Sequence, residues 1–181
     1  MKRFTFVSLI LLISLYAFPS SFSAKSIKAP EWVISEWING SGISLRALQG
    51  TVVVVEFFQL WCPGCNKFSI PLMKQWNQTF HSEINAGKLK ILSIHTVFEG
   101  HDYQTPERLK NFVKEKSIHH LVGVDHHNPG EHLPETMKRY NTMGTPEVAI
   151  IDKKGAIKMQ KFGGFDTEKA ERLIRYLLAS D

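Results

Sequence analysis

The chain of 181 residues has only two cysteines, and both lie in one short segment, Trp61-Cys62-Pro63-Gly64-Cys65. About 1 % of the ways to place two cysteines in a chain of this length give this spacing, so chance is a poor explanation. A zinc site would need two further ligands at ordered spacing, and a structural disulfide usually closes a longer loop. The pair therefore indicates a disulfide that opens and closes during function.

Long uncharged segments are also scarce, and the longest is at the N-terminus. Met1-Lys2-Arg3 is a short basic start, and residues 4–24, apolar for the most part to residue 18, carry no charge. This pattern is typical of a signal peptide over residues 1–24, cut after Ser23 or Ala24. The alternative is an uncleaved membrane anchor, because residues 4–24 are just long enough to span a bilayer. In both cases residues 25–181 face an oxidising space, periplasmic or otherwise extracytoplasmic.

A strong excess of one charge is missing as well. The 22 Lys and Arg residues outnumber 17 Asp and Glu residues, and loss of Lys2 and Arg3 with a signal peptide lowers the net charge from +5 to about +3. Basic residues are spread along the chain and often stand beside acids, which argues against a nucleic-acid partner. Because repeats, low-complexity tracts and long linkers are not found, residues 25–181 are predicted to form one domain.

The surroundings of the two cysteines predict different roles for them. They follow a β-branched and aromatic run, Val52 to Phe58, which indicates a central strand buried on both faces. Pro63 suits the first position of a helix, which makes Cys62 the N-cap and places Cys65 in the first turn. Unpaired amides and the helix dipole would lower the pKa of the Cys62 thiol. We therefore expect Cys62 to be the attacking nucleophile and Cys65 to be the resolving thiol.

Periodicity and punctuation predict alternating strands and helices, hence an α/β sheet with helices on both faces. Strands are expected at 52–58, 89–97, 121–124, 148–152 and 156–162, and helices at 63–80, 105–115, 133–140 and 167–178. Pro71 should kink the first helix and Thr167 should cap the last. The Asn39-Gly40 pair, between short apolar pieces, predicts a small hairpin ahead of the main sheet.

Two parts of this pattern resemble the thioredoxin-like fold. The run Val52 to Cys65 looks like its strand-to-active-site segment, and Met143-Gly144-Thr145-Pro146 with residues 148–155 looks like its cis-proline loop and following hairpin. The predicted N-terminal β-hairpin, the inserted helix near residues 105–115 and the signal segment are most similar to the exported TlpA/ResA-like thiol-disulfide reductases. The resemblance covers roughly residues 30–180. It implies a central mixed β-sheet flanked by helices on both faces.

The resemblance also implies roles for residues that would contact a substrate. Pro146 matches the family's cis-proline, and the backbone of Thr145 would pair with an extended substrate segment. Trp61 matches the tryptophan before the first cysteine and would offer a flat apolar surface to a partner, with plain packing as the alternative. Glu147 departs from the family, where many relatives carry threonine. An acid beside the disulfide would oppose the thiolate and select basic partners.

Glu56 interrupts the otherwise apolar run before the cysteines. An unpaired carboxylate in a buried strand is costly, so this residue calls for a reason. Its position, six residues before Cys62, matches the buried acid of thioredoxin. Burial would raise its pKa toward neutrality and suit it to take a proton from Cys65. The alternative is a glutamate paired with Lys88 or Lys90.

The histidines invite a metal site, since five of eight lie in residues 119–132: His119, His120, His126, His127 and His132. Neighbouring histidines on a strand point to opposite faces and no thiol is near in sequence, which favours a solvated loop over a metal site. Loops after parallel strands share the edge that holds the active-site helix. Residues on them are candidates to approach Cys62, where an imidazolium would lower the thiol pKa: His95, Glu99, His101, His126 and His127.

Three classes of function remain from the sequence. The leading one is an exported reductase of protein disulfides, which uses only the Cys62-Cys65 pair as its redox group. The resemblance implies that it is re-reduced by a membrane thiol-disulfide donor and acts in a pathway such as cytochrome c maturation. The second is a disulfide-forming oxidase with the same site. The third is a non-enzymatic metal carrier using both cysteines and a histidine. Peroxidase chemistry is disfavoured, because its motif would need proline at Val55 and Thr or Ser at Gln59.

Overall fold

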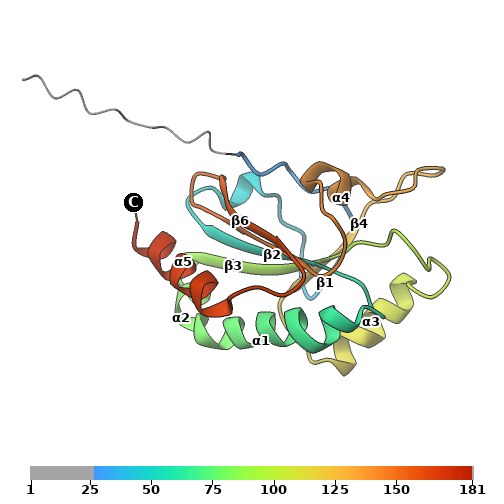
Figure 1. Cartoon of the computed structure of the whole chain (residues 1–181), viewed down its shortest axis with the longest axis horizontal. Helices are drawn as coiled ribbons and strands as arrows, with labels where there is room; N and C mark the ends of the chain where they lie inside the picture. Colours follow the sequence, from blue (N-terminus) through green and yellow to red (C-terminus); the bar gives the residue numbers. More distant parts are fainter. Residues whose placement is uncertain (1–26, 181) are drawn as a thin grey trace, which may run out of the picture.

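The computed structural model describes residues 27–180, so the predicted signal segment 1–24 lies outside the described residues. Six strands form one mixed sheet in the order β1-β4-β3-β2-β5-β6 (Figure 1). Their bounds are β1 Ile34–Ile38, β2 Val52–Phe58, β3 Leu89–His95, β4 Leu121–Asp125, β5 Glu147–Ile151 and β6 Ile157–Phe162. Strand β2 pairs in parallel with β3 and antiparallel with β5, and all its residues are buried. Its apolar sequence correctly predicted this interior position.

Helices cover both faces of the sheet, as predicted, but unequally. Figure 1 shows α1 (Ile70–Thr79), α2 (His81–Asn85), α3 (Pro106–Glu115) and α5 (Thr167–Ala179) on one side, with α4 (Glu135–Tyr140) on the other. The connections β2-α1-β3 and β3-α3-β4 step across the sheet in the same direction. Right-handed crossovers in one direction place their helices on the same face.

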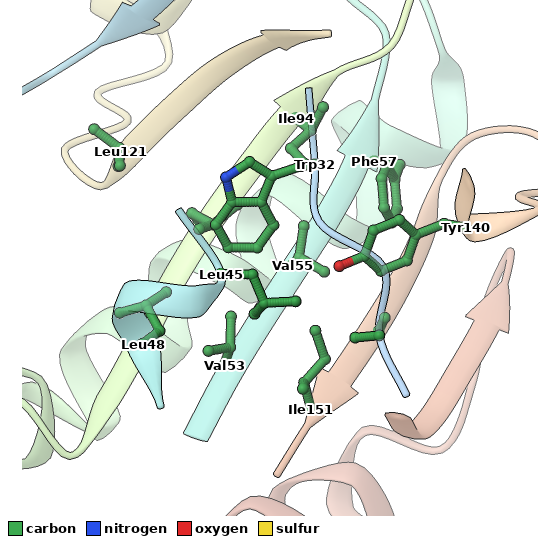
Figure 2. Close-up of a cluster of buried hydrophobic side chains, with 13 residues drawn as sticks. Trp32, Leu45, Leu48, Val53, Val55, Phe57, Ile94, Leu121, Tyr140 and Ile151 are labelled. Atoms are coloured by element: carbon green, nitrogen blue, oxygen red, sulfur yellow. The ribbon is translucent and has the colours of Figure 1, made fainter. Parts of the chain in front are cut away.

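The face with α4 is closed largely by the segment that precedes β2. Figure 2 shows this apolar cluster, which contains Trp32, Leu45, Leu48, Val53, Val55, Phe57, Ile94, Leu121, Tyr140 and Ile151. The rings of Phe57 and Tyr140 lie with centroids 5.1 Å apart, and Trp32 Nε1 donates to Ile43 O over 2.8 Å. Leu45 caps the start of the short 3-10 helix η1 (Arg46–Leu48), and Leu48 is its last residue. This packing buries one face of β2 and leaves the other face for α1 and α5.

The predicted N-terminal hairpin is wrong. Strand β1 is an edge strand that pairs antiparallel with β4. Asn39 does turn the chain, but its Nδ2 donates to the carbonyls of Ile118 (2.8 Å) and His120 (2.9 Å), which ties the turn to the segment before β4. After this turn the backbone does not return along β1. Ile43 packs instead against the apolar cluster that contains Trp32. Burial of apolar surface therefore overrides the local hairpin signal.

The predicted kink at Pro71 is a π-helical turn. The helix begins at residue 63, is π-helical over η2 (Cys65–Ser69) and continues as α1. Proline has no amide hydrogen for the carbonyl four residues earlier, so the regular hydrogen-bond ladder breaks just before it and a wider turn fits. Trp76 and Phe80 are fully buried, as the helical spacing predicted.

Other helix ends follow local capping rules with one correction. Thr105 Oγ1 accepts the Arg108 amide over 3.3 Å, as predicted for the start of α3. The cap of α5 is Asp166, whose carboxylate accepts the Lys169 amide over 2.9 Å, and Thr167 is the first helical residue. In the part of the chain described here, no helix is long and apolar enough to cross a membrane.

Replacing Trp76 with alanine is expected to lower the free energy of unfolding by about 3–5 kcal/mol, because its fully buried indole would leave a cavity between α1 and the sheet. Urea unfolding followed by circular dichroism measures this loss. The matched control is Tyr176→Ala on α5, whose side chain is 68 % exposed and whose loss should stay below about 0.5 kcal/mol. Equal losses in the two variants would contradict this core.

Candidate active site

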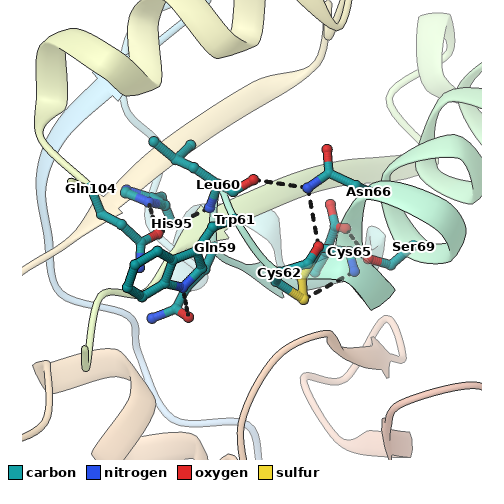
Figure 3. Close-up of a disulfide and its surroundings, with 10 residues drawn as sticks. Gln59, Leu60, Trp61, Cys62, Cys65, Asn66, Ser69, His95 and Gln104 are labelled. Carbon is teal, nitrogen blue, oxygen red and sulfur yellow. Dashed lines mark hydrogen bonds between the residues drawn. A yellow bond between two sulfur atoms is a disulfide. The ribbon is translucent and has the colours of Figure 1, made fainter. Parts of the chain in front are cut away.

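Cys62 and Cys65 form a disulfide where β2 leads into the first helix, with their Cα atoms 5.2 Å apart (Figure 3). The Cys65 amide donates to Cys62 Sγ over 3.0 Å, and the Asn66 amide donates to Cys62 O over 3.1 Å. Cys62 Sγ therefore occupies the place of an N-cap acceptor, as the proline at position 63 predicted. An amide and a helix N-terminus directed at this sulfur stabilise a thiolate on it.

The two sulfurs differ in access to solvent. Cys62 is 7 % exposed, whereas Cys65 is fully buried in an apolar cluster with Phe58, Ile70 and Leu109. A thiol that attacks a partner's disulfide must be reachable from outside, while a resolving thiol needs to reach only its neighbour. The asymmetry matches the different roles predicted for the two cysteines.

Trp61 lies beside the disulfide and is held by the segment that precedes α3. Its ring stacks on Tyr103 with centroids 5.6 Å apart, and the Arg108 guanidinium lies 4.4 Å from the Tyr103 centroid. A Cβ at Gly100 would lie 2.0 Å from the indole, so the backbone approaches the ring closely there. Trp61 is nevertheless 45 % exposed, which leaves part of the ring for a partner. Sequence reasoning missed Tyr103 and Arg108, because no local motif links them to Trp61.

The loop before Cys62 is fixed by Gln104, which sequence reasoning also missed. Gln104 Oε1 accepts the Leu60 amide (3.0 Å) and lies 3.1 Å from His95 Nε2, and Gln104 Nε2 donates to Glu99 O over 3.0 Å (Figure 3). Because an amide oxygen only accepts, His95 carries its proton on Nε2. Burial lowers the pKa of His95 to about 4, so the ring is neutral at pH 7. The predicted imidazolium effect of His95 on Cys62 is therefore wrong.

The other candidate histidines contact one another or nearby loop residues, His101 on the loop after β3 and His126 and His127 on the loop after β4. The rings of His101 and His127 lie 5.2 Å apart, and His126 Nε2 lies 3.1 Å from Asn128 Oδ1. Within residues 27–180, no group of three or more His, Cys, Asp and Glu residues is arranged to hold a metal ion. A metal carrier would need such a group at the two cysteines.

The loop predicted to face the disulfide contains a cis Thr145–Pro146 bond, as the resemblance implied. Pro146 lies against the turn between the cysteines, since a Cβ at Gly64 would be 2.9 Å from its Cδ. Glu147 is buried, and its carboxylate accepts the Met143 amide (2.9 Å) and Gln160 Nε2 (2.5 Å). Glu147 therefore ties the loop to β6, and the expectation that it would select basic partners is wrong.

Glu56 is a buried acid without a lysine partner. Its side chain points to the α1 side of β2, where Oε1 accepts the Ser69 hydroxyl (2.5 Å) and Oε2 accepts the Ser93 hydroxyl (2.6 Å). Burial raises the pKa of Glu56 to about 7, although both hydroxyl donors act in the opposite direction. Because two serines satisfy the carboxylate, the alternative of pairing with Lys88 or Lys90 is wrong.

The hydrogen bond to Ser69 connects this acid to the active-site helix. Ser69 ends the π-helical turn that Cys65 begins (Figure 3). A group with a pKa near neutrality exchanges its proton at little cost, which is what a general acid or base requires. The structure thus places Cys62 and Cys65 at the start of the helix that follows β2, and it links Glu56 on β2 to this helix through Ser69.

Comparison with known proteins agrees with this fold and site. A model of the Redoxin family matches residues 26–174, so the chain belongs to the Redoxin family. It is 27 % identical over 151 residues to the protein DipZ of Mycobacterium tuberculosis. The match covers 80 % of this chain and 20 % of DipZ. The chain thus spans about a fifth of the length of that relative.

Two further relatives match over most of their length. The thiol-disulfide oxidoreductase ResA of Bacillus cereus is 26 % identical over 150 residues, covering 83 % of this chain and 75 % of ResA. A solved thiol-disulfide isomerase from Corynebacterium glutamicum is 39 % identical with a TM-score of 0.76, covering 84 % of this chain and 98 % of that one. The predicted thioredoxin-like fold is confirmed. The described domain is a thioredoxin-like domain of the thiol-disulfide oxidoreductase class.

The pKa of Glu56 predicts a pH-dependent stability. The folded protein keeps a proton on Glu56 up to about pH 7, whereas the unfolded chain loses it near the ordinary glutamate pKa of 4.5, so the contribution of Glu56 to stability falls as pH rises between these values. The free energy of unfolding of oxidised wild type minus that of Glu56→Gln should fall by up to about 3 kcal/mol across this range. Urea unfolding between pH 4.5 and 8 measures the difference.

The control for this experiment is Glu115→Gln, an exposed acid on α3. The difference between wild type and this variant should change less with pH than the difference for Glu56→Gln, because the side chain of Glu115 lies in solvent. The neutral buried His95 acts with the opposite sign, but equally in all three proteins, so its effect cancels in each difference. If the difference in free energy of unfolding between wild type and Glu56→Gln does not change with pH, Glu56 has an ordinary pKa.

Proposed function

We propose that this protein is an exported thiol-disulfide oxidoreductase that reduces disulfides of protein substrates through the Cys62-Cys65 pair. The observation that carries the proposal is the asymmetry of the two sulfurs. Cys62 keeps 7 % exposure and accepts an amide hydrogen at a helix N-terminus, while Cys65 is fully enclosed. The similarity to ResA, a thiol-disulfide oxidoreductase, supports the same class of reaction.

The reaction consists of two thiol-disulfide exchanges. The Cys62 thiolate attacks one substrate sulfur, the substrate disulfide breaks, a Cys62–substrate disulfide forms, and the other substrate sulfur leaves as a thiolate. Cys65 then gives its proton to Glu56 and attacks Cys62 Sγ, which releases the second substrate thiolate. The substrate gains two electrons and takes up two protons, and the protein is left with the Cys62–Cys65 disulfide.

Glu56 supports the second exchange, because a buried thiol is a poor nucleophile until it loses its proton. With a pKa of about 7, the carboxylate is available as a base near neutral pH, and it returns its proton to solvent after the exchange. The substrate itself would contact Trp61, which is 45 % exposed beside Cys62, and the Thr145-Pro146 loop, which packs against Gly64. An extended substrate segment would pair with the Thr145 backbone as an added strand.

The location and the electron donor follow from the same reasoning. Residues 1–24 have the composition of an export signal or a membrane anchor. An oxidising compartment keeps a C-x-x-C pair as a disulfide, so each cycle of reduction needs a donor of thiol electrons. We assign that part to a membrane thiol-disulfide donor, with cytochrome c maturation or a related pathway as the setting that the family resemblance suggests.

The reduction potential of the Cys62-Cys65 pair tests the direction of the reaction. A reductase is expected to have a reduction potential of about −270 mV, whereas an oxidase has one of about −120 mV. Equilibration of the protein with glutathione or dithiothreitol buffers, read by thiol alkylation, gives the value. A potential at the oxidising end would overturn the proposed direction while keeping the two cysteines as the redox pair.

Single cysteine variants test the assigned roles. Cys65→Ser is expected to accumulate a mixed disulfide with a reporter such as oxidised insulin, because Cys62 still attacks but nothing resolves the intermediate. Cys62→Ser is the matched control and should trap at least about tenfold less, because Cys65 is enclosed. Non-reducing electrophoresis measures both adducts. Equal trapping would show that the two sulfurs are equally reachable and would contradict the assignment.

A further inference from the structure

Glu56 belongs to a longer chain of hydrogen bonds that the reaction above does not use. Ser93 on β3 is the register partner of Glu56, and its Oγ lies 2.8 Å from Nε2 of His120, the residue before β4. His120 Nδ1 lies 3.1 Å from Nδ2 of Asn77 on α1. The chain therefore runs from the carboxylate across β3 to the segment before β4 and back to the active-site helix.

The Asn77 end of this hydrogen-bond chain determines which atom donates and which accepts in each of its hydrogen bonds. Asn77 Nδ2 also donates to Met73 O over 2.8 Å, so this atom is an amide nitrogen that only donates. His120 Nδ1 therefore accepts, and burial lowers the pKa of His120 to about 4, so the neutral ring has its proton on Nε2. That N–H points at Ser93 Oγ, whose own hydrogen points at Glu56 Oε2.

This polarity decides which oxygen of Glu56 can be protonated. A proton on Oε2 would need Ser93 to accept it and to turn its own hydrogen away. The His120 side offers no acceptor, because Nε2 carries a proton and Nδ1 is occupied by the Asn77 amide. Oε1 faces Ser69 instead, whose hydroxyl can turn and accept.

We infer that His120 is a positioning residue which, through Ser93, keeps Glu56 Oε2 as an acceptor and leaves Oε1, on the side of the Cys65 helix, to take the proton of Cys65. The inference rests on the proposed function of Glu56 as the proton acceptor. It extends that function to a residue that lies outside the C-x-x-C motif and the cis-proline loop.

The other side chains around this hydrogen-bond chain are largely apolar. On β5 the register partner of Glu56 is Val148, and α3 and α5 face this side of the sheet with apolar residues only: Leu109, Val113, Ala170, Ile174 and Leu177. The titratable or charged groups around the hydrogen-bond chain are Cys65 on η2, His95 on β3, which is bonded to Gln104, and His119 and Lys90 beside His120. Lys74 on α1 and His81 on α2 line the same surface groove as Asn77 and His120. His120 borders a surface groove lined by Asn77, His81 and His119, so a different side chain has room there.

The test follows the Glu56 carboxyl directly, by carbon-13 NMR titration of the oxidised full chain. In Ser93→Ala and in His120→Leu the midpoint should rise by about one pH unit, a tenfold higher proton affinity, because the carboxylate loses its directed donor. His120→Gln keeps an N–H for Ser93 and should restore the wild-type midpoint. The matched control is His119→Leu, which changes the exposed neighbour and should leave the midpoint unchanged.

The same variants are then compared in the release of a preformed Cys62–substrate mixed disulfide, measured against pH. The midpoint of this profile should shift upward with the NMR midpoint in Ser93→Ala and His120→Leu. An unchanged NMR midpoint in both variants overturns the inference about His120. If Glu56→Gln releases the substrate with the wild-type rate and profile, the proposed function of Glu56 fails instead, whatever the NMR midpoints show.

Discussion

The structure depends on one constraint, a carboxylate buried in the central strand of its sheet. Placing such a group out of water costs several kcal/mol unless its oxygens receive hydrogen bonds. Glu56 receives them from Ser69 on the active-site helix and from Ser93 on β3, so helix and strand must keep one arrangement around it. His120 and Asn77 extend the same requirement to β4 and α1. The acid is thus part of the core that carries the cysteines.

A second set of contacts positions the disulfide relative to that core. The helix begins with Cys62 Sγ as the acceptor of its own first turn, and Cys65 closes against apolar side chains below it. Gln104 holds the backbone just before this turn, and Pro146 packs against it from the other side. Elements from three separate parts of the chain therefore meet around the turn between the cysteines, where Cys62 keeps partial exposure and Cys65 is enclosed.

The success of sequence reasoning followed the range of the interaction concerned. The strand Val52 to Phe58 and the cap at Thr105 were predicted correctly, because burial on both faces and a cap three residues from its donor leave local signals. The hairpin at Asn39 was not, because the amide of Asn39 bonds to residues about eighty positions later. Gln104 was missed for the same reason, since nothing in its neighbourhood marks it as the partner of Leu60.

The amino-acid sequence by itself determined the C-x-x-C pair and the burial of an acid six residues before Cys62, and it predicted which of the two thiols attacks. These follow from spacing along one strand and one helix turn, where neighbours in sequence are neighbours in space. Only the tertiary structure decided what surrounds that acid: serines instead of a lysine, and a neutral His120 behind Ser93. Hydrogen bonds across a sheet depend on strand order and register, which pattern and propensity do not encode.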